Sequence, residues 1–359
     1  MLSIIFVLTV GLLANLLGGC GGGASTTPET TATVSTSTTT SSTTTTTSGG
    51  GSGGGGGIGV GGTGSSWTRA TSAAGFSGRN GQASVVFDGK LWVIGGFDGT
   101  DYLNDVWYSA DGVTWTLATG APGFPKRYSH ACVVFNDGSG DKLWVIGGVG
   151  SAYYNDVWSS SDGITWTKKS SAAGFSSREA FACLVYNGKI WVIGGQMQLY
   201  PFKLSDVWSS SDGVTWTKES SAAGFSPRFR QAGVVFNDNL WVIGGWDGTS
   251  DLKDVWHSSD GRTWIQANDG SFTGREGHSS VVFNGKMWVI GGANNSVGKF
   301  SDAWSSSDGS SWTLVTGEAG FSARYQHTSV VTNEGGTEKM WVIGGTNDTS
   351  YFRDVWSGR

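Results

Sequence analysis

The sequence has little cysteine, little charge and no excess of basic residues, and each shortage excludes a class of protein. Its 359 residues include 3 cysteines, too few for the disulfide framework of small secreted domains. The 23 lysines and arginines are outnumbered by 28 acidic residues, so we expect no nucleic-acid partner, which would require a basic face. The sequence shows no Ser-His-Asp ordering and no phosphate-binding loop, and we predict no cofactor. Glycine (60) and tryptophan (19) are instead abundant, although proline (5) is scarce.

The N-terminus has the pattern of an export signal. Residues 2–17 form an apolar run that ends in Leu-Gly-Gly-Cys at Cys20. This ending resembles the lipobox of bacterial lipoproteins, which implies that residues 1–19 are a signal peptide and that the Cys20 thiol is lipidated. No lysine or arginine precedes the run, and an ordinary cleaved signal or a short uncleaved anchor are alternatives, although a membrane span needs roughly 17–25 apolar residues. We therefore predict a lipid anchor at Cys20 in the outer membrane or at the surface of a bacterial cell envelope.

A low-complexity segment follows Cys20. From residue 24 to residue 64 the chain is rich first in threonine and serine and then in glycine. Such a segment has almost no apolar surface to offset the entropy lost on ordering, so we predict a disordered linker over residues 20–64. Forty flexible residues have a reach of roughly 35 Å, which would hold a domain away from a membrane.

Eighteen of the 19 tryptophans recur three times in each of six repeats, and a period of about fifty residues indicates a repeat architecture. The first class stands in W-V-I-G-G and comprises Trp92, Trp144, Trp191, Trp241, Trp288 and Trp341. The second ends D-V-W or D-A-W and comprises Trp107, Trp158, Trp208, Trp256, Trp304 and Trp356. The third closes runs such as S-D-G-V-T-W and comprises Trp67, Trp115, Trp166, Trp216, Trp264 and Trp312.

Each repeat is predicted to form four short antiparallel strands. In the first repeat the β-branched and apolar runs place these strands at residues 83–87, 91–94, 105–108 and 113–116. The turn signals Asp-Gly-Lys and Ala-Asp-Gly separate the first strand from the second and the third from the fourth. Four such strands per repeat are typical of a propeller blade.

The pattern R-x-x-(H)-x-x-V-V-F-N-G-K-L-W-V-I-G-G … N-D-V-W … T-W resembles the kelch repeat, six times over residues 66–359. It departs from that repeat by using tryptophan where tyrosine is common before V-I-G-G, and S-S-D-G-x-T-W in place of D-P-x-T-N-x-W. The resemblance implies an all-β, six-bladed kelch-like propeller over residues 65–359, and we expect it to be monomeric.

The two ends of the repeat region predict how the ring closes. The chain ends just after the third strand of the sixth repeat, at Trp356, whereas residues 66–70 match a fourth strand that has no blade of its own. We therefore predict that residues 66–70 complete blade six, because closure protects sheet edges that would otherwise be open to pairing.

The loops after the second and fourth strands are expected on one face, and the former vary most in length and content. Loops on a rigid scaffold concentrate binding residues, so we place the ligand on this face. The nineteenth tryptophan, Trp246, falls here beside Asp247, where it suits sugar stacking or a partner hot spot, with packing against a neighbouring loop as the alternative.

Six arginines end the loops that follow the fourth strands: Arg79, Arg127, Arg178, Arg228, Arg275 and Arg324. Six guanidinium groups around a channel mouth would bind an anionic sugar or carboxylate. The structural alternative, which the exact repetition favours, is that each arginine pairs with an aspartate of a D-V-W run.

The residues after these arginines differ from blade to blade and are better functional candidates: Asn80, Tyr128, Glu179, Phe229, Glu276 and Tyr325. Arg230 adds a further cation in the fourth repeat. Our leading hypothesis is a membrane-tethered, non-catalytic module that binds a protein or a glycan through this face. The alternative is a sugar-acid-processing enzyme that resembles kelch-type N-acetylneuraminate epimerases, with acid–base work by Glu179 and Glu276 and carboxylate binding by Arg228 and Arg230.

Two further residue sets have structural interpretations. His130, His278 and His327 occupy one equivalent position, and a metal site is not expected because only two of their blades are adjacent. The copper chemistry of galactose oxidase is likewise not expected, since that family has seven blades and a Cys–Tyr crosslink. Cys132 and Cys183 occupy a position that otherwise holds small residues, and we expect them to act as small apolar side chains rather than as a disulfide.

Overall fold

The computed structural model describes residues 66–200 and 202–359. The predicted signal peptide, Cys20 and the linker therefore lie outside the described residues. Within the described ranges the regular secondary structure is entirely β, and no helical segment there has the length and apolarity to cross a bilayer.

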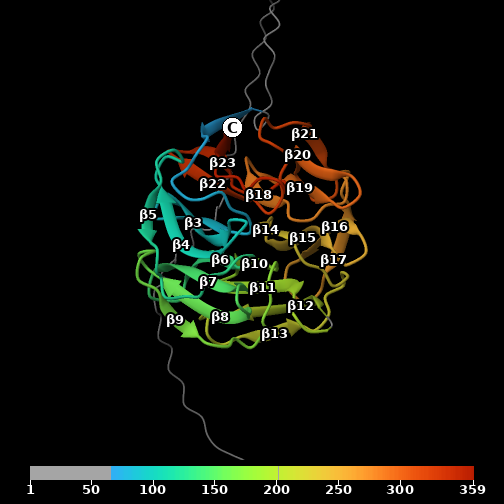
Figure 1. Cartoon of the computed structure of the whole chain (residues 1–359). Coiled ribbons are helices and arrows are strands. Elements are labelled where there is room, and N and C mark those ends of the chain that lie inside the picture. The colour runs from blue at the N-terminus through green and yellow to red at the C-terminus, as the bar shows by residue number, and fades with distance from the viewer. Residues whose placement is uncertain (1–65, 201) are drawn as a thin grey trace, which may run out of the picture. The chain divides into compact units, whose positions relative to one another are not determined.

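The described residues form six four-stranded antiparallel sheets, which follow one another around a ring (Figure 1). Blade 1 consists of β2 (Ala83–Phe87), β3 (Lys90–Phe97), β4 (Tyr102–Ser109) and β5 (Thr116–Thr119). Blade 2 consists of β6 (Ala131–Asn136), β7 (Asp141–Val149), β8 (Tyr153–Ser160) and β9 (Thr167–Ser170). Blade 3 consists of β10 (Ala182–Tyr186), β11 (Lys189–Gln196), β12 (Lys203–Ser210) and β13 (Thr217–Ser220).

The remaining three blades repeat this order. Blade 4 consists of β14 (Ala232–Phe236), β15 (Asn239–Trp246), β16 (Asp251–Ser258) and β17 (Ile265–Asp269). Blade 5 consists of β18 (Ser279–Phe283), β19 (Lys286–Asn294), β20 (Gly298–Ser306) and β21 (Thr313–Thr316). Blade 6 consists of β22 (Thr328–Glu334), β23 (Thr337–Ile343), β24 (Val355–Gly358) and β1 (Trp67–Thr71).

The predicted fold and its closure are confirmed. The first strand of each blade packs against the first strands of its two neighbours, and β2 contacts β22, which completes the ring. Strand β1 pairs with β24 in antiparallel register, with Trp67 opposite Gly358 and Arg69 opposite Trp356. The N-terminal strand thus forms the outer edge of blade 6, one residue further along the chain than predicted.

The strand boundaries of blade 1 differ from the prediction; the third strand, for example, begins at Tyr102 rather than at residue 105. The fourth strand of blade 1 begins at Thr116 rather than at residue 113, because the Asp111 carboxylate accepts hydrogen bonds from the Val113 and Thr114 amides (2.8 Å each) and prolongs the turn. The second strand, predicted to end at residue 94, continues through Gly95 and Gly96, and its register shifts there in a bulge.

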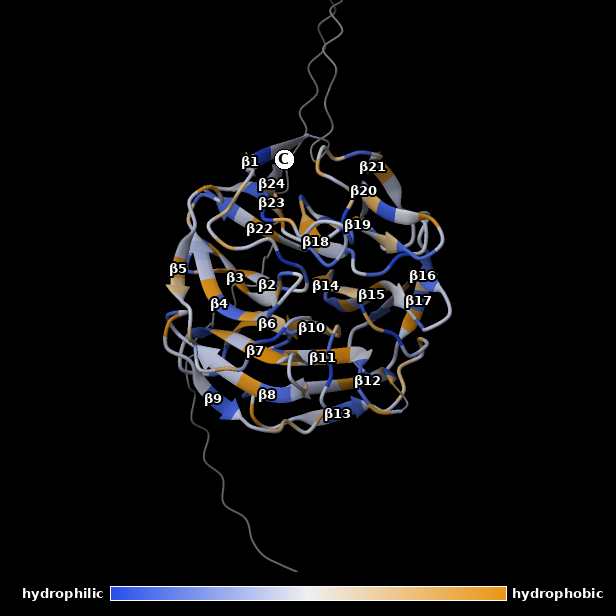
Figure 2. Cartoon of the chain, viewed as in Figure 1, coloured by the Kyte–Doolittle hydropathy of each residue, from blue (hydrophilic) through white to orange (hydrophobic). Residues whose placement is uncertain are grey.

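The hydrophobic core lies between the blades. Each of the clusters of buried residues joins the inner strands of two neighbouring blades, and hydrophobic residues run along strands such as β7 and β11 (Figure 2). The W-V-I-G-G tryptophans hold these interfaces: Trp92 Nε1 donates to the Phe87 carbonyl (2.9 Å), and Gly163 of blade 2 lies on its ring. A Cβ atom at Gly163 would lie 2.2 Å from Trp92 Cζ3, and the residue has a φ of 72°, so both space and backbone require glycine.

Candidate functional site

The ends of the loops that follow the second and fourth strands are joined on one face of the ring, here called the loop face. In each blade, the residue after the loop arginine pairs with the residue after the double glycine of the second strand. These bridges are Asn80 with Phe97, Tyr128 with Val149, Glu179 with Gln196, Phe229 with Trp246, Glu276 with Ala293 and Tyr325 with Thr346. The six positions that vary in chemistry therefore form a ring on this face, as the alternation of strand direction predicts.

The six arginines are fully buried scaffold residues. Arg127 is 0 % exposed; its Nη1 and Nη2 atoms donate to the two Asp156 carboxylate oxygens (2.7 and 2.9 Å), and Nη1 also donates to the Gly147 carbonyl. Trp158 Nε1 donates to the same carboxylate (2.7 Å). Equivalent ion pairs join Arg79 to Asp105, Arg178 to Asp206, Arg228 to Asp254, Arg275 to Asp302 and Arg324 to Asp354.

These contacts favour the structural alternative for the arginines. Burial alone would raise the pKa of Asp105, but the hydrogen bonds and charge of Arg79, with a further bond from Trp107, hold it below its ordinary value. Both charges of the pair are thus fixed inside the blade. A ligand on the loop face meets none of the six guanidinium groups in this arrangement, and this includes Arg228 of the hypothetical catalytic set.

A closed ring of backbone hydrogen bonds narrows the central channel. The Ser129 amide donates to the Gly81 carbonyl (2.7 Å), and the same bond repeats from blade to blade until the Gly81 amide donates to the Gln326 carbonyl (2.9 Å). The residues of this ring all have φ between 51° and 60°: Gly81, Ser129, Ala180, Arg230, Gly277 and Gln326. We call these the ring residues.

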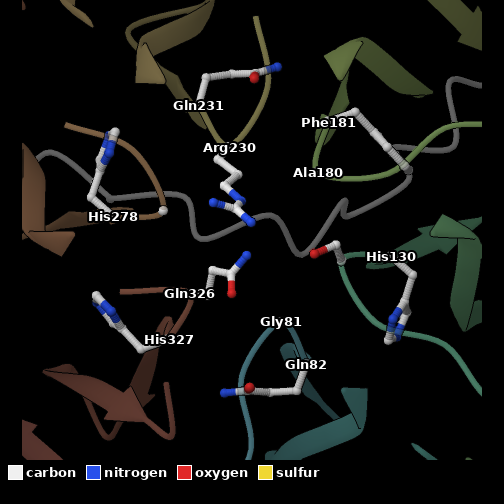
Figure 3. Close-up of a pocket in the computed structure, with 12 residues that line it drawn as sticks. Gly81, Gln82, His130, Ala180, Phe181, Arg230, Gln231, His278, Gln326 and His327 are labelled. Atoms are coloured by element: carbon white, nitrogen blue, oxygen red, sulfur yellow. The ribbon is translucent and has the colours of Figure 1, made fainter. Parts of the chain in front are cut away.

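Arg230 lies at the centre of the channel mouth. Its side chain points inward among the ring residues and faces Gln326, in a cavity of about 120 Å³ (Figure 3). Arg230 Nη1 donates to Glu276 Oε1 (3.0 Å). With the Gln326 amide in the orientation that satisfies both of its polar atoms, its oxygen accepts from Arg230 Nε (2.9 Å) and Nη2 (3.1 Å). The guanidinium is therefore held by partners within the protein.

Each ring residue faces the variable residue of the next blade. A Cβ atom on Gly81 would lie 2.8 Å from Tyr128 Cδ2, and Arg230 reaches Glu276. The resulting partners around the ring are Gln326 with Asn80, Gly81 with Tyr128, Ser129 with Glu179, Ala180 with Phe229, Arg230 with Glu276 and Gly277 with Tyr325. Around the ring, pairs whose variable residue is polar alternate with pairs whose variable residue is aromatic. The six blades have the same backbone, but the chemistry of the mouth therefore repeats about three times.

Both glutamates at the mouth are buried. Burial raises the pKa of Glu179, and hydrogen bonds from Tyr153 and Tyr128 and the charge of Arg230 only partly oppose this. Burial also raises the pKa of Glu276, again against the charge of Arg230. The structure thus brings Glu179, Glu276 and Arg230 together, as the enzyme alternative requires, and adds the tyrosines as neighbours.

Trp246 is the last residue of β15 rather than an exposed loop residue, and it is half-buried. Its ring meets Phe229 edge to face with 5.5 Å between centroids, and Lys203 Nζ of blade 3 lies 5.3 Å from its centroid. The contacts show the packing role that the sequence left as an alternative.

The β11–β12 loop of blade 3 holds the largest group of exposed apolar residues on the loop face, although Val297 of the β19–β20 loop is also 68 % exposed. Leu199 is 71 %, Tyr200 84 % and Phe202 48 % exposed, and we call these three residues the apolar tip. The same loop begins at Gln196, the bridge partner of Glu179. This loop is one of the variable loops predicted to bind the ligand, but neither its exposed residues nor Tyr153 were predicted individually. The extra length of the loop was the available signal.

The histidines and cysteines lie within the scaffold. Burial lowers the pKa of His130, His278 and His327 to about 3, so the rings are neutral, and the described residues contain no group of three or more His, Cys, Asp or Glu that could hold a metal. Cys132 and Cys183 are free thiols, and burial raises the pKa of Cys132 to about 12.

Comparisons with known proteins identify the repeats. A model described as the KLHDC2/KLHL20/DRC7 Kelch-repeats domain matches residues 63–195, and the Kelch motif matches residues 227–257. No curated protein matches the chain. The chain thus carries Kelch repeats in an all-β, six-bladed propeller.

Proposed function

We propose that this Kelch-repeat propeller is a non-catalytic binding module that docks a protein partner on its loop face. The apolar tip is the observation that carries the proposal. Side chains as exposed as Leu199 and Tyr200 bury little apolar surface within the chain, whereas their burial against a partner is favourable. On the same face, half-buried Trp246 and Tyr325 and the Arg230–Glu276 pair supply the aromatic and polar groups typical of a protein interface. A glycan is the second ligand class compatible with this face.

Photo-crosslinking tests the proposal. A photoreactive phenylalanine at Tyr200 is expected to crosslink a discrete partner in the native host, because this side chain would lie inside the interface. Ile164 provides the matched control: it is 54 % exposed and lies in the turn between the third and fourth strands, on the opposite face. Equal crosslinking at both positions, or none at Tyr200, would contradict docking on the loop face.

The structure assembles only part of the hypothetical sugar-acid enzyme. Glu179, Glu276 and Arg230 meet at the mouth and both carboxyl groups have a raised pKa, but Arg228 is buried with Asp254. The cavity of about 120 Å³ is also small beside the ~300–1,000 Å³ of typical small-molecule pockets. A shallow mouth beside an exposed apolar tip supports a binding surface rather than a reaction chamber.

We also propose that the propeller is tethered to a bacterial envelope through lipidated Cys20. The support is the sequence alone: an apolar run followed by Leu-Gly-Gly-Cys and a long Thr/Ser/Gly segment. A Cys20→Ser variant is expected to move from the membrane fraction to the soluble fraction, and its retention with membranes would exclude the lipid tether.

A further inference from the structure

The channel mouth contains two equivalent glutamates, one of which the protein itself neutralises. Glu179 of blade 3 and Glu276 of blade 5 both follow a scaffold arginine and are 8 % and 6 % exposed. Each faces the ring residue of the preceding blade, which is Arg230 for Glu276 and Ser129 for Glu179. The backbone bonds that set these two relations are equivalent: Gly277 N to Arg230 O is 2.9 Å, and Ala180 N to Ser129 O is 2.8 Å.

The first of these glutamates shows which group such a position accommodates. We define the Glu276 cage as Glu276, Phe229 and Tyr325. The Arg230 guanidinium donates to Glu276 (3.0 Å) and lies 5.4 Å from the Phe229 ring centroid and 6.0 Å from that of Tyr325. A carboxylate flanked by aromatic faces thus holds a cation by charge and by cation–π attraction.

The second glutamate has similar surroundings without a cation from the protein. We define the Glu179 cage as Glu179, Tyr128 and Tyr153. Tyr153 Oη donates to Glu179 Oε1 (3.1 Å), and Tyr128 stacks on Tyr102 with 5.4 Å between centroids and an interplanar angle of 25°. The ring residue that faces this cage, Ser129, is too short to carry a charge into it. Within residues 66–200 and 202–359, Glu179 makes no ion pair.

Arg230, the cation at the channel mouth, does not supply the missing counter-charge of Glu179. Arg230 contributes electrostatically at Glu179, but its donors are engaged by Glu276 and Gln326. A carboxylate that is nine-tenths buried and lacks a cationic partner is costly unless the group is protonated or a charge is supplied from outside. The apolar tip starts from the same loop as Gln196, the bridge partner of Glu179, so a bound chain can contact both features.

We propose that the Glu179 cage binds the positively charged side chain of an arginine or lysine in a protein partner, in the way that the Glu276 cage binds Arg230. The inference rests on the proposed function, since it names the chemistry of the partner residue that the loop face recognises. It also reverses the charge expected of the ligand: the six scaffold arginines suggested an anion, whereas the group left without a counter-charge is a carboxylate.

The test uses the full chain and the peptide acetyl-Gly-Gly-Arg-Gly-Gly-amide, with the citrulline peptide as the uncharged isostere. Tyrosine-labelled protein is titrated and followed by NMR. We expect the arginine peptide to shift the ring resonances of Tyr128 and Tyr153, and the citrulline peptide to bind at least tenfold more weakly. Glu179→Gln is expected to weaken arginine-peptide binding at least tenfold.

Ser129→Arg provides a second variant that keeps Glu179 in place. Arg230 itself occupies a ring position with a φ of 54°, so arginine is tolerated in this backbone conformation, and Ser129 has a φ of 51°. The introduced guanidinium should fill the Glu179 cage and weaken peptide binding at least tenfold, whereas Ser129→Ala should bind within twofold of the unaltered protein. Melting curves establish that each variant is folded.

Three results would overturn the inference: no shift at Tyr128 and Tyr153 in the unaltered protein, equal binding of the citrulline peptide, or undiminished binding by folded Ser129→Arg. The crosslinking result separates this failure from that of the proposed function. A partner captured at Tyr200 with no arginine-peptide binding would retain the docking face and remove the cation site. Peptide binding at the Glu179 cage without a partner crosslinked at Tyr200 would retain the cation site and remove the docking face.

Discussion

In every blade, the scaffold arginine and the residue after it are neighbours in the chain but differ in environment and in variability. Arg178 is fully buried, is paired with Asp206 and has an identical counterpart in each repeat, whereas Glu179 differs from its counterparts and borders the channel mouth. The repeated position closes hydrogen bonds within its own blade, while the variable position meets a ring residue from another blade. The comparison teaches that sequence identity among the repeats indicates scaffold, and that departures from it indicate the binding surface.

The largest effect is expected from opening the ring of blades, which holds both the scaffold arginines and the variable residues in place. A chain that begins at residue 72 lacks β1, leaves β24 with an unpaired edge and exposes the apolar cluster that Trp67 covers, which includes Trp356. We expect loss of a cooperative melting transition, because the missing strand pairing is comparable with the total stability of a domain, on the order of 5–15 kcal/mol. A chain that begins at residue 66 is the matched control, and equal melting temperatures of the two chains would refute the role of closure.

At neutral pH, breaking one buried ion pair should have the next largest effect. Asp206→Ala leaves the Arg178 guanidinium buried without its counter-charge, and we expect a loss of about 3–5 kcal/mol in the free energy of unfolding. Urea titration followed by tryptophan fluorescence measures this loss. The double variant Arg178→Met with Asp206→Leu should be less destabilised, since it removes both charges. If Asp206→Ala lowered the free energy of unfolding by less than about 1 kcal/mol, the Arg178–Asp206 pair would not be important for stability.

Acid should destabilise the scaffold through its buried histidines. Their folded-state pKa of about 3 lies below the ordinary value of 6.5, so the unfolded chain binds more protons and stability is lost as the pH falls from about 6.5 towards 3. Linkage gives about 2 kcal/mol per histidine at pH 5. Gln82 and Gln231 occupy the equivalent position in other blades, so replacing His130, His278 and His327 with glutamine should preserve stability at pH 7.5 and reduce its loss at pH 5. An unchanged pH dependence of urea unfolding would contradict this.

The smallest effect is expected from Glu179 at the channel mouth. Its contribution to stability changes with pH in the direction opposite to that of the histidines. The folded-state pKa of Glu179 is raised, so the folded chain binds the proton more tightly and stability falls as the pH rises from the ordinary glutamate pKa through the folded one. Glu179→Gln lacks this loss and should equal or slightly exceed the unaltered protein at pH 7, by less than about 1 kcal/mol, with the difference vanishing below pH 4. A large loss of stability in this variant at pH 7 would make Glu179 a scaffold residue.

Much of the fold and part of the site were accessible from the sequence. The three classes of tryptophan predict the number of blades, the strand order and the closure by the N-terminal strand, because each class marks one fixed position in a repeated unit. The fourth strands were misplaced because Asp111 captures two backbone amides, a side-chain contact that strand propensity does not register. Glu179, Glu276 and Arg230 were identified because they break the repetition.

The sequence by itself determined the architecture, since periodic apolar residues and turn glycines specify local strands, and six copies with a spare fourth strand leave one way to close the ring. Only the tertiary structure decided the roles of the arginines and glutamates. Arg127 and Arg230 lie in equivalent loops of two blades, but Arg127 is buried against Asp156 within its blade, whereas Arg230 reaches across a blade boundary to Glu276. Which charge remains without a partner depends on distances between residues 46 positions apart in the chain, and the packing of neighbouring blades sets those distances.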